Sequence, residues 1–150
     1  MKEKLRKAEG MTIYLLTGAV SGLLLNALIM HSPLPELFPA YTDSFRGRLY
    51  TVGLLQGILL YCLLAPVLEE VLFRLLAYDF LYKHIGFWGA ALISSFIFAA
   101  YHMNMVQGIY AFIMGMLFCT LYRRDHRMAV PISLHIGANL AVWLFSNLLK

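Results

Sequence analysis

The sequence is poor in charged residues. Only 13% of its 150 residues are Asp, Glu, Lys or Arg, whereas a soluble globular domain has about 25%. Hydrophobic residues make up 61% of the chain and the mean hydropathy is +0.71. This deficit excludes an ordinary soluble domain. It predicts one polytopic membrane domain over residues 1–150, with the lipid bilayer as its surroundings and no separate soluble module.

Cysteine is also scarce, and no CxxC or zinc-type Cys pattern is present. Cys62 and Cys119 both lie inside apolar runs, so we expect buried thiols. The net charge of +4 does not indicate a nucleic-acid partner, because the basic residues stand at the ends of apolar runs. The first apolar run is about twenty residues long and lacks a small-x-small site, so we expect a membrane span rather than a cleaved signal peptide.

The first span is predicted over residues 11–30, which carry no charge and are long enough to cross the bilayer as a helix. Gly18 and Gly22 form a GxxxG pattern, which we interpret as close packing within the chain. Residues 31–48 contain three closely spaced prolines, which disfavour a helix. The aromatic residues of this segment predict a loop on the membrane interface; they are Phe38, Tyr41 and Phe45.

Residues 49–68 are charge-free, and a helical pattern continues to about Tyr82. This is too long for one upright span, so tilt or a kink is expected, and Pro66 removes a backbone donor inside it. Residues 85–122 have the length of two spans, with a turn near His102, and residues 128–149 form the last span. The prediction is an all-α membrane bundle of about five transmembrane helices without strands.

The distribution of Lys and Arg predicts the orientation. With the N-terminus inside, eight of these residues lie on the cytoplasmic side and three outside, which favours a cytoplasmic N-terminus. The eight are Lys2, Lys4, Arg6, Lys7, Lys83, Arg123, Arg124 and Arg127; the three are Arg46, Arg48 and Lys150. We therefore expect an integral protein of the cell membrane, with residues 1–10 as a basic cytoplasmic N-terminus.

A short set of polar side chains remains at membrane depth: Glu69, Glu70, Arg74, His102, Asn104, His135 and Asn139. Ionisable residues are costly there, so they are functional candidates. Glu70 and Arg74 are spaced i, i+4 and can pair. Glu69 points about 100° away from Glu70 on a helix. The spacing predicts that Arg74 neutralises Glu70 and that Glu69 faces a cavity.

The chemistry that suits this set is hydrolysis. A desolvated carboxylate such as Glu69 can act as a general base toward water, and a histidine can carry a proton to a leaving amine. A second histidine with Asn139 can donate hydrogen bonds to an oxyanion. No Ser or Cys is paired with a base. At 1.5 Å per residue, His135 lies only ~10 Å from the start of its helix, so it reaches Glu69 only if that helix starts deep in the membrane.

Other interpretations stay open at this point. A lone intramembrane His or Asn often links helices without further function. The same residues also suit a proton relay in a carrier. Glu69, His102 and His135 could hold a divalent metal such as zinc, since two His and one Glu form a known catalytic set, although no HExxH motif is present. The spacing does not decide between these interpretations.

Three ordered motifs resemble those of the CAAX protease and bacteriocin-processing family, the Abi-type intramembrane proteases that include prenyl-protein endopeptidases. They are Glu69-Glu70-x-x-x-Arg74, Phe98-x-x-x-His102 and His135-x-x-x-Asn139. The resemblance covers about residues 64–147 and makes 49–149 a protease-like core, after a first span and interfacial loop over 11–48. Leu75 departs from the small residue that often follows the motif arginine, and few helices precede the core.

The resemblance implies a helical bundle with a cavity between the motif helices. In it, Glu69 would activate water, His102 would assist, His135 and Asn139 would hold the oxyanion, and Glu70 with Arg74 would support the site. The implied activity is endopeptidase cleavage of a peptide or protein tail in the membrane. We favour a mechanism without a metal, because the oxyanion role gives Asn139 a purpose. The alternatives are a non-catalytic protein that binds a peptide or bacteriocin in immunity or regulation and, ranked lowest, a proton-coupled carrier.

Overall fold

The computed structural model describes residues 2–40, 44, 47 and 51–148, and every regular element in these ranges is helical. In chain order they are α1 (Lys2–Met30), α2 (Leu34–Leu37), α4 (Leu54–Gly57), the π-helical η1 (Ile58–Leu64), α5 (Ala65–Glu70), the π-helical η2 (Val71–Tyr78), α6 (Asp79–Tyr101), α7 (Met105–Asp125) and α8 (Ala129–Leu148). The chain is therefore an all-α membrane bundle, as the sequence predicted. Three helices of the described part are long and apolar enough to cross a membrane: Gly10–Met30, Met105–Asp125 and Ala129–Leu148.

The elements from α4 to α6 follow one another without an intervening loop. The run is divided at Gly86, which has φ 68° and ψ −174° inside α6. Glycine adopts a positive φ without a Cβ clash, so the chain changes direction there. The predicted five helices thus correspond to α1, the run before Gly86, the rest of α6, α7 and α8. The break lies next to residue 85, where the sequence analysis placed the start of a new helix.

The predicted loop over residues 31–48 contains a short helix. α2 begins directly after Pro33, its N-cap residue, and Pro35 lies in its first turn, where the missing N–H of a proline is not needed. Phe38 at the end of α2 is exposed, whereas Tyr41 and Phe45 lie outside the described residues. The placement of this loop on the membrane interface stays a prediction.

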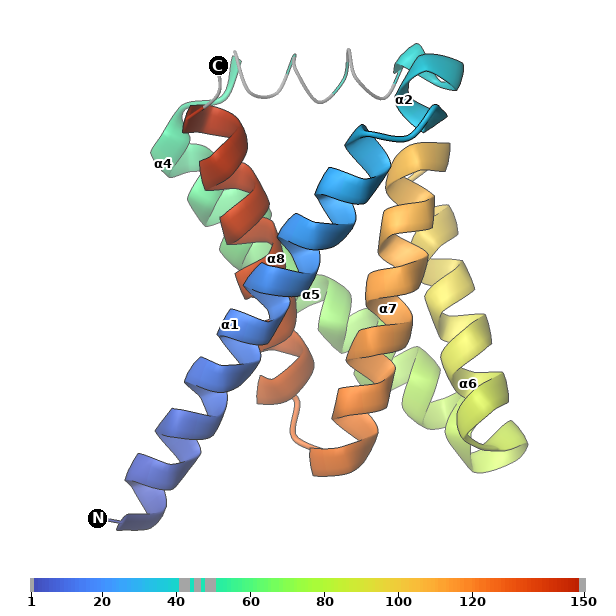
Figure 1. The fold of residues 1–150 in the computed structure, drawn as a ribbon. Coiled ribbons are helices and arrows are strands. Elements are labelled where there is room, and N and C mark those ends of the chain that lie inside the picture. Colours follow the sequence, from blue (N-terminus) through green and yellow to red (C-terminus); the bar gives the residue numbers. More distant parts are fainter. Residues whose placement is uncertain (1, 41–43, 45–46, 48–50, 149–150) are drawn as a thin grey trace.

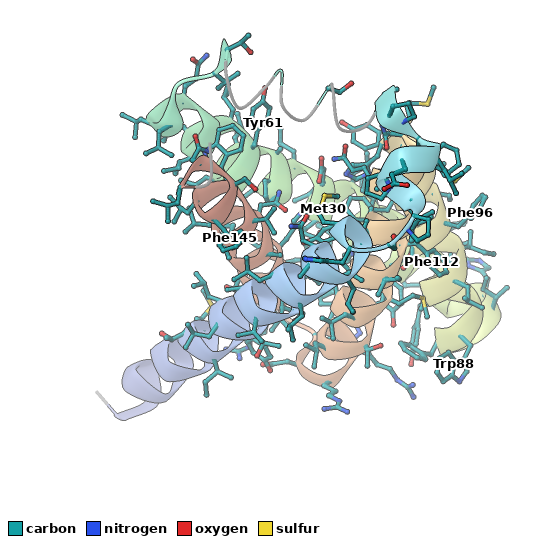
Figure 2. The ribbon with its side chains drawn as sticks, turned by 45° about the horizontal axis from the view of Figure 1, so that its top comes forward. Met30, Tyr61, Trp88, Phe96, Phe112 and Phe145 are labelled. Carbon is teal, nitrogen blue, oxygen red and sulfur yellow. The ribbon has the colours of Figure 1, made fainter. Side chains whose placement is uncertain are left out.

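The long helices form two groups, α1 with α8 and α6 with α7, and the α4-to-η2 run connects the two groups. Figure 1 shows α1 crossing the face of α8, while α6 and α7 lie side by side. The α4-to-η2 run packs against α8 at η1 and against α6 at η2. Trp88 and Phe96 lie at the outer edge of α6 in Figure 2 and are exposed. Large apolar side chains on the outside suit a surface that faces lipid.

Two glycines allow α1 to lie directly on α8. A Cβ at Gly18 would lie 1.9 Å from the Leu134 carbonyl oxygen, and one at Gly137 would lie 2.0 Å from the Leu15 carbonyl oxygen. Both contacts are with backbone, which cannot move aside as a flexible side chain does. Gly22 meets Ala138 in the same way. The GxxxG pattern therefore packs within the chain, as predicted.

We expect Gly18→Ala to destabilise the protein, because the methyl group forces α1 away from α8. Overpacking of a tight contact costs about 1–3 kcal/mol. Gly10→Ala is the matched control in the same helix, since a Cβ at Gly10 would have no neighbour within 4 Å. Thermal unfolding of the purified variants in detergent measures the difference. Equal melting temperatures for both variants would show that α1 does not depend on this contact.

Candidate active site

One cavity of about 210 Å³ collects the four residues predicted to be catalytic. Glu69 comes from α5, His102 from the end of α6, and His135 and Asn139 from α8. Asn104 lies outside this lining and instead caps the start of α7, where its side chain accepts a hydrogen bond from the Gln107 backbone N–H. The polar side chains of three separate helices thus converge rather than scatter through the bundle.

Glu70 and Arg74 form the ion pair that their spacing predicted. Arg74 Nε lies 3.0 Å from Glu70 Oε2, and the two side chains are 1% and 0% exposed. The guanidinium carbon also lies 4.5 Å from the ring centre of Phe98 and 5.3 Å from that of Phe118. Aromatic ring faces attract a cation. A carboxylate and two rings therefore surround the buried positive charge.

His135 lies between the two adjacent carboxylates. Its Nδ1 is 2.7 Å from Glu70 Oε1, and its Nε2 is 3.6 Å from Glu69 Oε2. A carboxylate accepts, so Nδ1–H donates to Glu70. Glu70 consequently holds Arg74 through one oxygen and His135 through the other. The proximity of His135 to Glu69 was expected, but its hydrogen bond to Glu70 was not, because the two residues lie on helices far apart in the chain.

The depth of His135 follows from the start of α8. The helix begins at Ala129, and Figure 1 shows the preceding segment rising from the lower end of α7 before α8 starts. The fifth helix therefore begins above the end of its neighbour. His135 does reach Glu69, with Nε2 lying 3.6 Å from Glu69 Oε2, whereas the depth at which α8 starts in the membrane stays a prediction.

Glu69 is the carboxylate that faces the cavity. Its side chain is 15% exposed, whereas that of Glu70 is fully buried. Two neighbouring glutamates on one helix point in different directions because successive residues are about 100° apart. The structure therefore places Glu70 in the ion pair and Glu69 in the cavity.

The His102 side chain is oriented by a hydrogen bond to α6, the helix that His102 follows directly. Its Nδ1 lies 2.8 Å from the Phe98 carbonyl oxygen, one turn earlier in α6. A carbonyl oxygen only accepts, so Nδ1 carries the hydrogen. The Phe98 and His102 rings pack edge to face with centroids 4.9 Å apart. The Phe-x-x-x-His spacing thus fixes the orientation of the His102 ring in addition to placing both residues on one face.

Asn139 makes a contact that the sequence analysis did not foresee. Its Nδ2 donates to the Tyr61 backbone carbonyl, with an N···O distance of 2.9 Å. One helical turn further along α8, the Trp143 ring packs against Gly57, where a Cβ would lie 2.0 Å from Trp143 Cζ2. His135, Asn139 and Trp143 are spaced i, i+4 and i+8, so α8 presents one row of side chains to the α4-to-α5 run. This periodicity could have identified Trp143.

The cavity wall includes a residue outside the predicted core. Asn26 of α1 lines it, although the sequence analysis assigned the site to residues 49–149. Gln107 and Tyr110 of α7 line the same space. The sequence offered one sign of this role, because Asn26 is the single amide residue in the charge-free first span. The first helix therefore takes part in enclosing the site.

The residues that could hold a metal, Glu69, His102 and His135, all line the cavity. In the described part of the chain, no group of three or more His, Cys, Asp or Glu side chains is arranged to hold a metal ion. His135 Nδ1 donates to Glu70, which is a bond that metal-binding histidines also make through the ring nitrogen that does not hold the metal. Metal independence therefore stays a prediction.

Comparison with known proteins places the chain in a family context. Residues 51–141 match the model of the family described as "Type II CAAX prenyl endopeptidase Rce1-like". A protein of Bacillus subtilis (strain 168) that carries the name "Putative membrane peptidase YdiL" is 38% identical over 80 residues. That match covers 53% of this chain but 33% of the relative's length, so the similarity spans about a third of it. No solved structure matches this chain.

Proposed function

The chain belongs to the Rce1-like family of type II CAAX prenyl endopeptidases, and on this premise we propose that it is an intramembrane endopeptidase that hydrolyses a peptide bond with water. The observation that carries the proposal is the convergence of Glu69, His102, His135 and Asn139 on one cavity in an apolar bundle. Each buried polar group costs free energy in a membrane protein. A shared catalytic role would account for the presence of all four polar residues in this cavity.

Glu69 is the proposed general base. It accepts a proton from a water molecule in the cavity as the water oxygen attacks the carbonyl carbon of the scissile peptide bond. This role is supported by its position, because Glu69 faces the cavity while Glu70 is fully buried in the ion pair with Arg74. A carboxylate held in a buried ion pair with an arginine is a poorer base than one that faces the cavity.

Asn139 and His135 are the proposed donors to the oxyanion. An amide N–H and an imidazole N–H aimed at the developing negative charge stabilise the transition state. The Nδ1–H of His135 is engaged by Glu70, so Nε2 donates to the oxyanion when the ring carries both protons. Glu70 and Arg74 support this geometry by fixing the imidazole.

His102 is proposed to assist proton transfer to the leaving amine. Its Nδ1–H is bound to the Phe98 carbonyl, so Nε2 is the ring nitrogen that exchanges a proton. The proton that Glu69 takes from water must reach the amine nitrogen for the peptide bond to break. A histidine in the same cavity as the base provides a route for that transfer, since an imidazole nitrogen can both accept and release a proton.

The proposed substrate is a peptide or protein tail that enters the cavity from the membrane. The family description names prenyl endopeptidases, so a peptide with a farnesylated cysteine before the scissile bond is a suitable probe. The same peptide without the farnesyl group is the matched control. Purified protein in lipid nanodiscs is expected to cleave the farnesylated probe, with the products identified by mass spectrometry.

We expect cleavage to continue after exhaustive chelation with 1,10-phenanthroline and EDTA, because the proposed steps use only side chains and water. The measurement is the initial rate of probe cleavage before and after dialysis against chelator. A zinc peptidase treated in parallel shows that chelation was complete. Loss of activity that returns on adding zinc would instead assign Glu69, His102 and His135 as metal ligands.

The principal alternative is a protein that binds a peptide or bacteriocin without cleaving it, in immunity or regulation. Such a protein would bind the probe and release it intact, and its biological effect would survive loss of Glu69. Family membership favours the peptidase over this binder and over a proton-coupled carrier. A carrier would be indicated only by pH-driven uptake into liposomes that depends on Glu69.

A further inference from the structure

Pro66 leaves one backbone carbonyl of its helix without an intrahelical partner. In the π-helical turn of η1, the Ala65 N–H donates to the Leu60 carbonyl five residues earlier. The next bond of this ladder would join the N–H of residue 66 to the Tyr61 carbonyl, but proline has no N–H. The Tyr61 carbonyl is therefore the acceptor that this sequence leaves open.

The proline also accounts for the wide turn itself. Inside a helix, its ring clashes with the carbonyl four residues earlier. A π-helical turn separates the two groups, and such turns are frequent at functional sites. Pro66 is buried within α5, three residues before Glu69. The distortion and the proposed base thus belong to the same short stretch.

Asn139 supplies the missing donor from the neighbouring helix. Its Nδ2 lies 2.9 Å from the Tyr61 carbonyl oxygen, and its side chain lines the cavity. A carbonyl within an apolar bundle needs a donor from the protein or from water in the cavity, because no lipid group can provide one. The bond therefore ties the middle of α8 to the helix that carries Glu69.

We propose that Pro66 is a positioning residue, which acts by leaving the Tyr61 carbonyl open so that this carbonyl orients the Asn139 amide. A free asparagine can present either its oxygen or its NH₂ group to the cavity. Only the NH₂ end can bind a carbonyl, so Oδ1 cannot take its place. Because the amide is planar, fixing one N–H also fixes the direction of the other. That second N–H is the donor that the proposed oxyanion role needs.

The catalytic consequence rests on the proposed function, whereas the link between Pro66 and Asn139 does not. A preorganised donor avoids reorientation during the reaction, which is the main source of its catalytic effect. Replacing Pro66 would supply the Tyr61 carbonyl with a backbone N–H and release Asn139. The amide would then be free to rotate its oxygen toward the cavity, where it would repel an oxyanion.

The test is a double-mutant cycle on stability, which needs no substrate. In the wild-type background, Asn139→Ala leaves the Tyr61 carbonyl without a donor and is expected to lower the melting temperature by roughly 4 °C. In the Pro66→Ala background, the new N–H serves that carbonyl, so the same substitution should cost less than half as much. Equal losses in both backgrounds would overturn the proposal.

Pro131→Ala provides the matched background. Pro131 is also buried, but it lies in the first turn of α8, where a missing N–H leaves no acceptor open. Asn139→Ala should therefore cost as much in the Pro131→Ala protein as in the wild type. A reduced loss in this background too would mean that the coupling is not specific to Pro66.

The second readout is the cleavage rate of the farnesylated probe. Pro66→Ala is expected to lower kcat about tenfold or more while leaving KM and the melting temperature at or above the wild-type values. A purely structural proline would not separate activity from stability in this way, and unchanged kcat would refute the positioning role. If the wild type does not cleave the probe, the proposed function fails, but the stability cycle still decides whether Pro66 orients Asn139.

Discussion

Protein carrying Glu69→Gln is expected to lose probe cleavage by roughly 10²–10⁴-fold while remaining folded, because an amide cannot accept a proton from water. The fold should survive, since Glu70 and not Glu69 balances the buried charge of Arg74. The measurement is kcat in nanodiscs, together with the melting temperature of the same preparation. KM should change little, because glutamine has nearly the shape of glutamate.

Glu36→Gln is the matched control for this substitution. Glu36 is an exposed acid on α2, so its replacement removes one negative charge without touching the cavity. Full activity is expected for Glu36→Gln and near-complete loss for Glu69→Gln. Retention of the wild-type kcat by Glu69→Gln would remove the general-base assignment and leave the cavity as a binding site.

Arg74→Met is expected to cause the largest loss of stability. The substitution keeps an unbranched side chain between Phe98 and Phe118 but leaves the Glu70 carboxylate, which is 0% exposed, without its cation. Breaking a buried ion pair by removing one partner costs about 3–5 kcal/mol. Unfolding in detergent with a chemical denaturant measures this loss, and a lower yield of folded protein should accompany it.

Two further variants test whether the unpaired Glu70 charge causes the stability loss of Arg74→Met. Glu70→Gln combined with Arg74→Met removes both charges and should recover part of the lost stability, because no uncompensated charge remains. Arg127→Met breaks a more exposed pair with Asp125, in which the side chains are 38% and 27% exposed, and should cost about 0.2–1 kcal/mol. Equal stability of Arg74→Met and Arg127→Met would mean that burial of the Glu70 charge is tolerated without its partner.

The choice between the two glutamates illustrates what could be predicted from the sequence. Helical periodicity is local, so the spacing of Glu70 and Arg74 was enough to predict their pairing and to direct Glu69 elsewhere. The same periodicity placed Phe98 with His102 and His135 with Asn139. The scarcity of charge identified the class of protein, because long apolar runs are stable only where lipid replaces water.

Contacts between helices could not be predicted in this way. The bridge from His135 to both glutamates and the bond from Asn139 to the Tyr61 carbonyl depend on how deep α8 lies and how it is rotated. The contribution of Asn26 depends on how closely α1 crosses α8. None of these residues is near its partner in the chain, so no local pattern records the contact.

The sequence by itself determined that this chain is a bundle of apolar helices with a small set of acids, histidines and amides on particular helix faces. Only the tertiary structure decided that those faces meet in one cavity, and that Asn139 donates to the Tyr61 carbonyl. The reason is physical. The 3.6-residue turn fixes which residues share a face of one helix, whereas close packing at points such as Gly18 fixes which faces of different helices meet.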